Sequence, residues 1–317
     1  MELIDEYIDY TGGVKRYSDR TLQIYRGILE DFAAYLDGKP LADGLCPSMI
    51  RSYEVHLLDG RKLSKRTVGL HISVLSGFSK YLTKRGVLAS NPVRSVSRPK
   101  TDKLLPVFYR EESMASYFQK TVLYGSEDAL VLLSGENAFR EYESILRRLI
   151  IRILYFTGIR RSELISLKFS SLDFSRELVT VRGKGDKQRE IPLCANLIRE
   201  ISLYLQARKI LGIKAREGDG RLLLTPKGGP LYPEYVDRAV KRELGIEESI
   251  TARKSPHVLR HTIATELLND GVQLNSIKEM LGHASLAATQ VYTHNSIEKL
   301  KKTYTESHPL CQSSKKR

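Results

Sequence analysis

The sequence predicts a mainly α-helical protein of two domains, with a small β-sheet or hairpin in the second domain. Its 317 residues are more than one hydrophobic core usually organises. Apolar residues recur at helical spacing through most of the chain, whereas residues 177–193 alternate apolar and polar residues around a glycine-rich turn. Residues 91–106 are rich in proline and basic residues and lack a helical period. We therefore expect a helical domain over 1–90, a linker over 91–106 and a second domain over 107–317.

The N-terminal domain carries clear helix start and stop signals. They delimit helices from Ser18 or Asp19 to Gly38, from Pro47 to Leu58 and from Ser64 to just before Gly86. Basic residues lie on the polar side of the third helix and beside it: Lys62, Lys65, Arg66, Lys80, Lys84 and Arg85. A basic helical face is commonly only solvated surface. Because the flanking loops are basic as well, we expect these six residues to contact a DNA backbone.

The second domain is predicted to be helical apart from the hairpin. Periodicity indicates helices at 138–157, 195–211, 233–243, 256–269, 273–281 and 285–303. The segment 119–137 is weakly patterned, and no element is assigned to it. The hairpin turn contains Gly183-Lys184-Gly185-Asp186, which places Lys184 at or beside the turn.

Composition favours a polyanionic partner. The chain has 51 Lys and Arg against 37 Asp and Glu, a formal net charge of +14. Charge alone does not separate a DNA-binding protein from an RNA-binding one. Three cysteines without paired spacing argue against a disulfide framework or a zinc site and fit a reducing cytosol. No apolar run approaches the roughly 20 residues of a membrane span, so we expect a cytoplasmic protein without membrane contact.

Two short motifs contain candidate phosphate ligands. One, near the C-terminus, has a histidine and an arginine, and the other, near the middle of the chain, has two arginines. In Ser255-Pro256-His257-Val258-Leu259-Arg260, proline suits a first helical turn and places His257 and Arg260 three residues apart. An arginine fork at the start of a helix suits a phosphate group. Upstream, Arg160 follows a glycine turn and can point into a cleft while Arg161 points out. Taken singly, the His257–Arg260 pair is a weak signal, because a structural histidine beside a surface arginine is commoner. The segment at 157–164 also fits an ordinary helix–turn–helix junction whose arginines face water.

The ordered set of motifs is more specific than any one of them. It comprises TGIRRSEL at 157–164, the GKG hairpin, and the continuous stretch SPHVLRHTIATELLNDGVQLNSIKEMLGHASLAATQVYTH. In this order and spacing the set resembles the tyrosine recombinase (phage integrase) family, and its bacterial Xer branch in particular. The resemblance covers about residues 1–309. It implies a two-domain DNA clamp, built from a SAM-like helical core-binding domain and a catalytic domain.

The resemblance implies a role for each matching residue. Tyr292 would be the nucleophile that forms a 3′-phosphotyrosyl bond, while Arg160 and Arg260 would hold the two non-bridging oxygens of the phosphate. Glu163 would fix the arginines without reacting. Arg161 is the rival to Arg160.

The remaining roles concern protons and the leaving group. His257 would assist the arginines and handle the proton of the nucleophile, and His283 would donate a further hydrogen bond to the phosphate. Lys184 would protonate the departing 5′-oxygen, with Lys187 as a less favoured rival. Because the phosphoester energy is kept in the protein–DNA bond, the reaction would need neither ATP nor a metal, and we expect no cofactor.

Family members act as tetramers on two DNA sites. The resemblance therefore implies a homo-tetramer, or a hetero-tetramer with a paralogous recombinase, in which residues 296–317 contact a neighbouring protomer. Dimer resolution, with or without a DNA translocase, is the favoured task. The segment 119–145 looks longer than in compact Xer proteins and leaves an integrase or invertase of a mobile element open. A type IB topoisomerase and a catalytically silent DNA-binding protein are less favoured interpretations of the same motifs.

Overall fold

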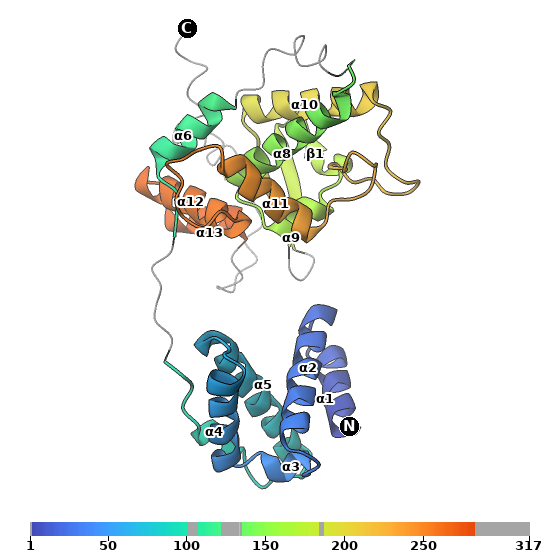
Figure 1. The fold of residues 1–317 in the computed structure, drawn as a ribbon. Coiled ribbons are helices and arrows are strands. Elements are labelled where there is room, and N and C mark those ends of the chain that lie inside the picture. Colours follow the sequence, from blue (N-terminus) through green and yellow to red (C-terminus); the bar gives the residue numbers. More distant parts are fainter. Residues whose placement is uncertain (1, 101–106, 122–132, 134, 184–186, 283–317) are drawn as a thin grey trace. The chain divides into compact units, whose positions relative to one another are not determined.

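The computed structural model describes residues 2–100, 107–121, 133, 135–183 and 187–282. The chain divides into two units, Met1–Leu104 and Leu105–Arg317, and each has a hydrophobic core of its own (Figure 1). The predicted helix at 285–303 lies outside the described residues. None of the helices in the described part of the chain has the length and apolar character that a membrane crossing requires.

The N-terminal unit is entirely helical in its described residues. Its helices are α1 (Glu2–Gly13), α2 (Asp19–Tyr35), α3 (Leu41–Gly44), α4 (Pro47–Val55), a π-helical turn (His56–Gly60), α5 (Lys65–Lys84) and a 3₁₀ turn (Pro92–Ser95). The hydroxyls of Ser18 and Ser64 cap α2 and α5, as the start signals predicted. The three predicted helices are confirmed, although the second ends in the π-helical turn.

Two features of this unit differ from the sequence-based expectations. Helix α1 was not predicted, yet it buries Ile4, Tyr7, Ile8 and Thr11 on one helical face. The first part of the predicted linker is not free of structure, because Val93 and Val96 pack into the N-terminal core at 1% and 7% exposure. Residues 101–106 of that linker lie outside the described residues.

The second unit surrounds one long buried helix, α8 (Ala138–Thr157). Packed against α8 are the helices α9 (Arg161–Ser166), α10 (Ala195–Ile210), α11 (Pro233–Leu244) and α12 (Pro256–Asn269). Helix α13 (Leu274–Leu281) lies beside α12 (Figure 1). Helices α8, α10, α11, α12 and α13 confirm the helices predicted at 138–157, 195–211, 233–243, 256–269 and 273–281, whereas α6 (Glu111–Lys120) was not predicted.

The predicted hairpin is confirmed and forms two strands of a three-stranded antiparallel sheet. Its strands are β2 (Leu178–Arg182) and β3 (Gln188–Pro192), and the short β1 (Leu172–Asp173) pairs with β2. In β3 the side chains of Arg189 and Ile191 point to the buried face, whereas Gln188 is exposed. The sheet therefore directs one arginine into the interior, toward the end of α13.

Candidate active site

The turn between α8 and α9 places Arg160. Gly158 ends α8 with a left-handed backbone conformation, φ 60°, which glycine adopts without strain. Arg160 is the N-cap residue of α9, and its backbone N–H donates to Glu163 Oε2 at 2.8 Å, one half of a capping box. Its side chain donates from Nη1 to Glu163 Oε1 at 2.9 Å. The carboxylate therefore fixes both the backbone and the guanidinium of Arg160.

Helix α12 supplies the second arginine. Ser255 caps the helix, and the hydroxyl of Tyr109 accepts a hydrogen bond from the Ser255 backbone N–H at 3.2 Å. One turn into α12, Arg260 is only 7% exposed. It donates from Nη1 to the carbonyl oxygen of Gly158 at 2.6 Å, which ties α12 to the turn that carries Arg160.

Three arginines meet at the C-terminal end of α13. The last carbonyl groups of a helix have no partner within it. Here three consecutive ones accept from guanidinium groups, and the donor–acceptor pairs are Arg189 Nε to Met280 O at 2.7 Å, Arg260 Nη2 to Leu281 O at 2.5 Å and Arg160 Nη2 to Gly282 O at 2.8 Å. The segment that leads directly to His283 is thus held by cationic donors from three different elements.

The arginine cluster, defined as Arg160, Arg189 and Arg260, carries more positive charge than the protein neutralises within it. Glu163 is the carboxylate that pairs with Arg160 and Arg189. Burial alone would raise the pKa of Glu163, but hydrogen bonds from Arg189 and from the backbone of Arg160 outweigh it and leave that pKa below its usual range. Among the described residues the cluster has three positive charges and one negative charge, so it favours a bound anion.

The excess of positive charge changes the pKa of Arg260. Its burial, together with the nearby guanidinium groups of Arg160 and Arg189, lowers the pKa of Arg260 to about 10. The group is still protonated at neutral pH. An anion such as a phosphate group, placed beside it, would relieve the repulsion among the three cations.

His257 lies one turn before Arg260 on α12, and its side chain is exposed to solvent. Partial burial of the ring and the positive charges of Arg161, His261 and Arg260 lower the pKa of His257 below 6.5. The imidazole is therefore neutral at neutral pH, and one of its ring nitrogens is available to accept a proton.

The structure brings three of the predicted site residues together, namely Arg160, Glu163 and Arg260. Lys184, His283 and Tyr292 lie outside the described residues. Of the two rivals, Arg161 pairs with Asp237 of α11 at 2.5 Å, and Lys187 is exposed to solvent. Arg189 was not predicted from the sequence. An arginine that alternates with Ile191 on the inward face of a strand was the available signal.

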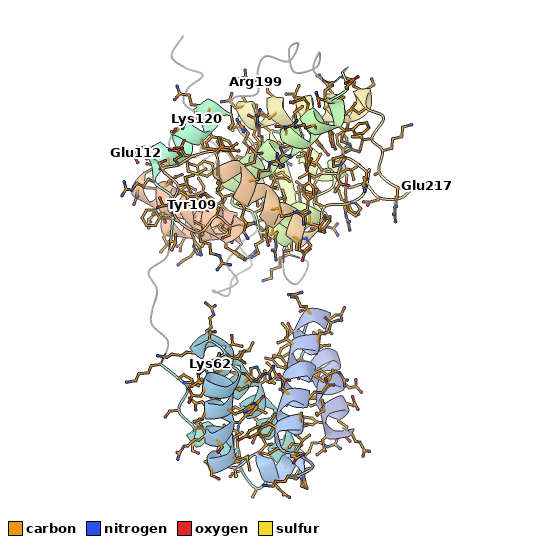
Figure 2. The ribbon with its side chains drawn as sticks, viewed as in Figure 1. Lys62, Tyr109, Glu112, Lys120, Arg199 and Glu217 are labelled. Carbon is orange, nitrogen blue, oxygen red and sulfur yellow. The ribbon has the colours of Figure 1, made fainter. Side chains whose placement is uncertain are left out.

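The six basic residues predicted to contact DNA are all exposed but do not form one group. Lys65 and Arg66 are the first two residues of α5, and Lys62 lies in the loop before it (Figure 2). The other three lie near the end of this 20-residue helix, which is about 30 Å long. Among these, Arg85 pairs with Glu6 at 3.0 Å and Lys84 lies over the Tyr10 ring.

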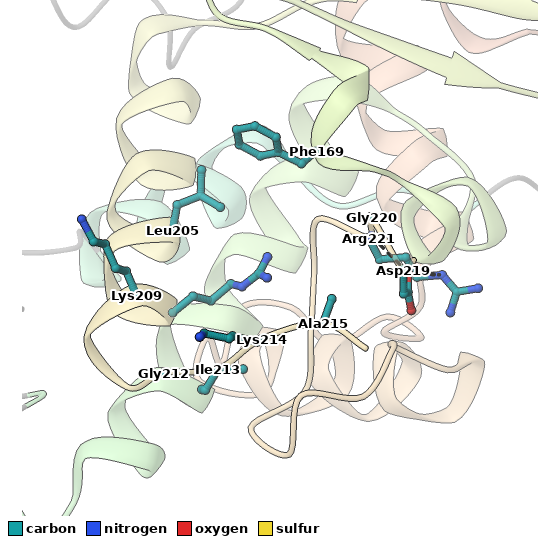
Figure 3. Close-up of a pocket in the computed structure, with 11 residues that line it drawn as sticks. Phe169, Leu205, Lys209, Gly212, Ile213, Lys214, Ala215, Asp219, Gly220 and Arg221 are labelled. Atoms are coloured by element: carbon teal, nitrogen blue, oxygen red, sulfur yellow. Dashed lines mark hydrogen bonds and ion pairs between the residues drawn. The ribbon is translucent and has the colours of Figure 1, made fainter. Parts of the chain in front are cut away.

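A separate pocket of about 400 Å³ lies between the end of α10 and the loop that follows it (Figure 3). Its lining includes Phe169, Leu205 and Ile213, and basic side chains such as Arg208 and Lys214. None of its lining residues belongs to the arginine cluster or to the predicted site. We therefore assign the site to the cluster and not to this pocket.

A mainly helical domain that gathers three arginines around one carboxylate, with a histidine nearby on the same helix as Arg260, is suited to bind and act on a phosphate group. Comparison with known proteins identifies the family. Residues 132–299 match the phage integrase family, and residues 4–86 match the N-terminal SAM-like domain of phage integrases. The chain belongs to the phage integrase family, the tyrosine recombinases, which are enzymes that cleave and rejoin DNA.

The curated relatives extend along nearly the whole chain. It is 39% identical to the tyrosine recombinase XerC of Bacillus licheniformis over 308 residues, which is 96% of this chain and 95% of that protein. It is 34% identical to the XerC of Listeria innocua over 310 residues, 97% of this chain and 98% of that protein. These similarities confirm the resemblance to the Xer branch. They show that the chain is a site-specific tyrosine recombinase.

Solved structures confirm the fold class. The XerH site-specific recombinase bound to its difH substrate matches with a TM-score of 0.63 and 21% identity, over 99% of this chain and 83% of that one. The Tn1549 transposon integrase in complex with circular intermediate DNA matches with a TM-score of 0.66 and 21% identity, over 94% of this chain and 97% of that one. The predicted architecture of a SAM-like helical domain followed by a catalytic domain is thus confirmed.

Proposed function

We propose that this recombinase cleaves DNA by attack of Tyr292 on a phosphodiester that is held by Arg160 and Arg260. The observation that carries the proposal is the anchoring of both guanidinium groups to the same helix end, where Glu163 also holds Arg160. Each guanidinium has five N–H donors. Arg260 uses donors on both terminal nitrogens for backbone carbonyls, and the structure gives its other donors no partner among the residues it describes, so they would bind a phosphate.

The chemistry requires positive charge that is in place before the reaction. As the Tyr292 oxygen bonds to phosphorus, negative charge grows on the non-bridging oxygens of the phosphorane. Donors that are already fixed stabilise this charge without reorganising, which accounts for a large share of the rate enhancement in such sites. The arginine cluster, with an excess of two positive charges in the described part of the chain, meets this requirement. His283 would add one more donor from the residue that follows Gly282.

Two proton transfers accompany the bond changes. The hydroxyl proton of Tyr292 leaves as its oxygen attacks, and the neutral imidazole of His257 would accept it. The bond between phosphorus and the 5′-oxygen breaks, and Lys184 would give that oxygen a proton, which leaves a free 5′-hydroxyl end. Attack by a second 5′-hydroxyl reverses these steps and releases Tyr292, so the strand is rejoined without an external energy source.

We propose double-stranded DNA with a specific recombination site as the substrate, and a tetramer formed on two such sites as the active assembly. The names of the curated relatives favour an Xer-type task, the resolution of dimeric chromosomes or plasmids. Residues 296–317 would contact a neighbouring protomer, either a second copy of this chain or a paralogous recombinase. The exposed Lys62, Lys65 and Arg66 would hold the DNA backbone from the N-terminal domain.

Covalent trapping tests the proposal and identifies the DNA site in the same experiment. The full chain would be incubated with sheared chromosomal DNA from the organism that encodes it, denatured, and recovered with its attached DNA for sequencing. Nicked duplexes that carry the recovered sequence would then be tested on denaturing gels. Wild type should give a covalent band that Tyr292→Phe lacks, while both proteins should bind the duplex equally.

The recovered sequence also separates the candidate functions. A single chromosomal site would support dimer resolution, whereas the ends of a mobile element would support an integrase or invertase. A band that persists in Tyr292→Phe would place the nucleophile elsewhere. Absence of a band in the wild type would count against cleavage and favour a silent DNA-binding protein. Relaxation of supercoils without recombination would indicate a topoisomerase.

A further inference from the structure

Arg189 connects three parts of the catalytic domain. It lies on β3, directly after the hairpin turn that contains Lys184, and it is 8% exposed. Its guanidinium donates to both oxygens of Glu163, from Nη1 at 3.1 Å and from Nη2 at 2.7 Å, and its Nε donates to Met280 O. The side chain therefore joins the hairpin, the first turn of α9 and the end of α13.

Glu163 is fully occupied because of this arrangement. Its Oε1 accepts from the side chains of Arg160 and Arg189, and its Oε2 accepts from the Arg160 backbone and from Arg189. A carboxylate with four such partners has little freedom to rotate. Without Arg189, one hydrogen bond would be lost from each oxygen, and Glu163 would be free to turn together with Arg160.

The neighbouring glycines show how closely the backbone surrounds this ion pair. A Cβ atom on Gly282 would lie 3.1 Å from Arg189 Nη1, and one on Gly183 would lie 3.5 Å from Glu163 Oε1 and 3.6 Å from Arg189 Nη1. Gly183 precedes Lys184, and Gly282 precedes His283. The backbone immediately before Lys184 and immediately before His283 is therefore packed against the Arg189–Glu163 pair.

We propose that Arg189 is a positioning residue for the cleavage reaction. It orients Arg160 through Glu163. It also holds the end of α13 in place, and His283 is the residue that follows this end. All of its guanidinium nitrogens are engaged with protein acceptors, so it is not assigned a contact with the DNA. This inference rests on the proposed function, because it concerns the rate of the step assigned to Tyr292.

Arg189→Lys tests the proposal because it keeps the charge and removes the two-point fork. Arg147→Lys is the matched control, since Arg147 is 8% exposed and also pairs with a buried carboxylate, Glu243, at 3.0 Å. Three quantities would be measured for each variant: the unfolding temperature, the affinity for the nicked duplex, and the single-turnover rate of covalent complex formation. We expect Arg189→Lys to cleave about a hundredfold more slowly with little change in DNA affinity.

A double-mutant cycle shows whether Arg189 acts through Arg160. If it does, Arg160→Lys combined with Arg189→Lys should cleave about as slowly as the slower single variant. Multiplication of the two single effects would overturn the proposed route through Arg160. Normal cleavage by folded Arg189→Lys, while the wild type forms its covalent band, would overturn the inference and leave the proposed function intact. Absence of a band in the wild type would refute both.

A second pair of variants covers the case in which Arg189→Lys does not fold. Gly282→Ala would push the Arg189 guanidinium by a few tenths of an ångström without replacing it. Gly271→Ala is its control, because Gly271 shares the positive φ, 81° against 66°, but has no neighbour within 4 Å of an added Cβ. We expect slow cleavage for Gly282→Ala only. Equal rates for the two variants would contradict the positioning role.

Discussion

Gly158 and Leu281 approach so closely that a Cβ atom on Gly158 would lie 2.5 Å from Leu281 Cδ2. This contact presses the end of α8 against the end of α13. The carbonyl oxygens of the same two residues both accept hydrogen bonds from Arg260. The absence of a side chain at Gly158 therefore permits both the helix contact and the position of the arginine.

Gly158→Ala should destabilise the protein and slow cleavage. A left-handed alanine costs about 1 kcal/mol, and the clash with Leu281 adds about 2 kcal/mol of overpacking. Gly212→Ala is the control, because Gly212 has nearly the same φ, 62°, and no atom within 4 Å of an added Cβ. Denaturant unfolding and cleavage assays would compare the two. Equal losses of stability would show that the contact with Leu281 is unimportant.

Arg160→Ala and Arg260→Ala should each slow covalent complex formation by at least about a hundredfold, as expected for the loss of a donor to a developing oxyanion. Arg161→Ala should cleave at nearly the wild-type rate, since its half-exposed side chain pairs with Asp237 outside the cluster. Single-turnover rates on a nicked duplex would measure all three. A large loss for Arg161→Ala with normal cleavage by Arg160→Ala would reverse the assignment of these two neighbours.

Local sequence patterns predicted much of the fold. Gly158 and Gly282 stand at the ends of periodic apolar stretches, and the structure places both as left-handed helix ends. The alternation of apolar and polar residues on either side of Gly183 predicted β2 and β3. The helix-end and the strand signals both depend only on residues that are neighbours in the sequence. Helix α1 shows the same kind of signal, at Ile4, Tyr7, Ile8 and Thr11, although it was not predicted.

The arginine cluster depends on contacts between residues that are far apart in the sequence. Glu163 and Arg189 are separated by 26 residues, and Arg189 and Met280 by 91. No periodicity reports such pairs, so Arg189 was missed although its inward position on β3 was visible in the alternation. The resemblance supplied Arg160, Glu163 and Arg260, and the structure adds the helix end that holds the arginines together.

Cleavage should slow on acidification because His257 then loses its capacity to accept a proton. Its pKa lies below 6.5, so the rate should be constant near neutral pH and fall as the pH drops through that lowered value. His257→Gln should cleave more slowly at neutral pH, and its acidic limb should disappear. Single-turnover rates between about pH 5 and 8 would measure both profiles. An acidic limb retained by His257→Gln would assign it to another group.

Deletion of residues 296–317 should impair coordinated recombination more than DNA binding. This segment has Ile297, Leu300 and Tyr304 at helical spacing and is proposed to contact a neighbouring protomer. Gel-shift titration would measure binding of one duplex, and a two-site recombination assay would measure exchange. The single variant Leu300→Asp serves as a milder test of the same contact. Unchanged recombination by both variants would show that protomers do not exchange this segment.

Lys65→Ala and Arg66→Ala should weaken binding to the duplex and reduce its salt dependence. The two side chains are exposed at the start of α5, and neither makes an ion pair with another residue in the described part of the chain. Each lost phosphate contact should lower the slope of log K against log salt by about 1. Arg85→Ala is the matched control, because its charge is partly neutralised by Glu6. Fluorescence anisotropy at several salt concentrations would supply the slopes. If Arg85→Ala lowered the slope while Lys65→Ala and Arg66→Ala did not, the DNA backbone would lie at the other end of α5.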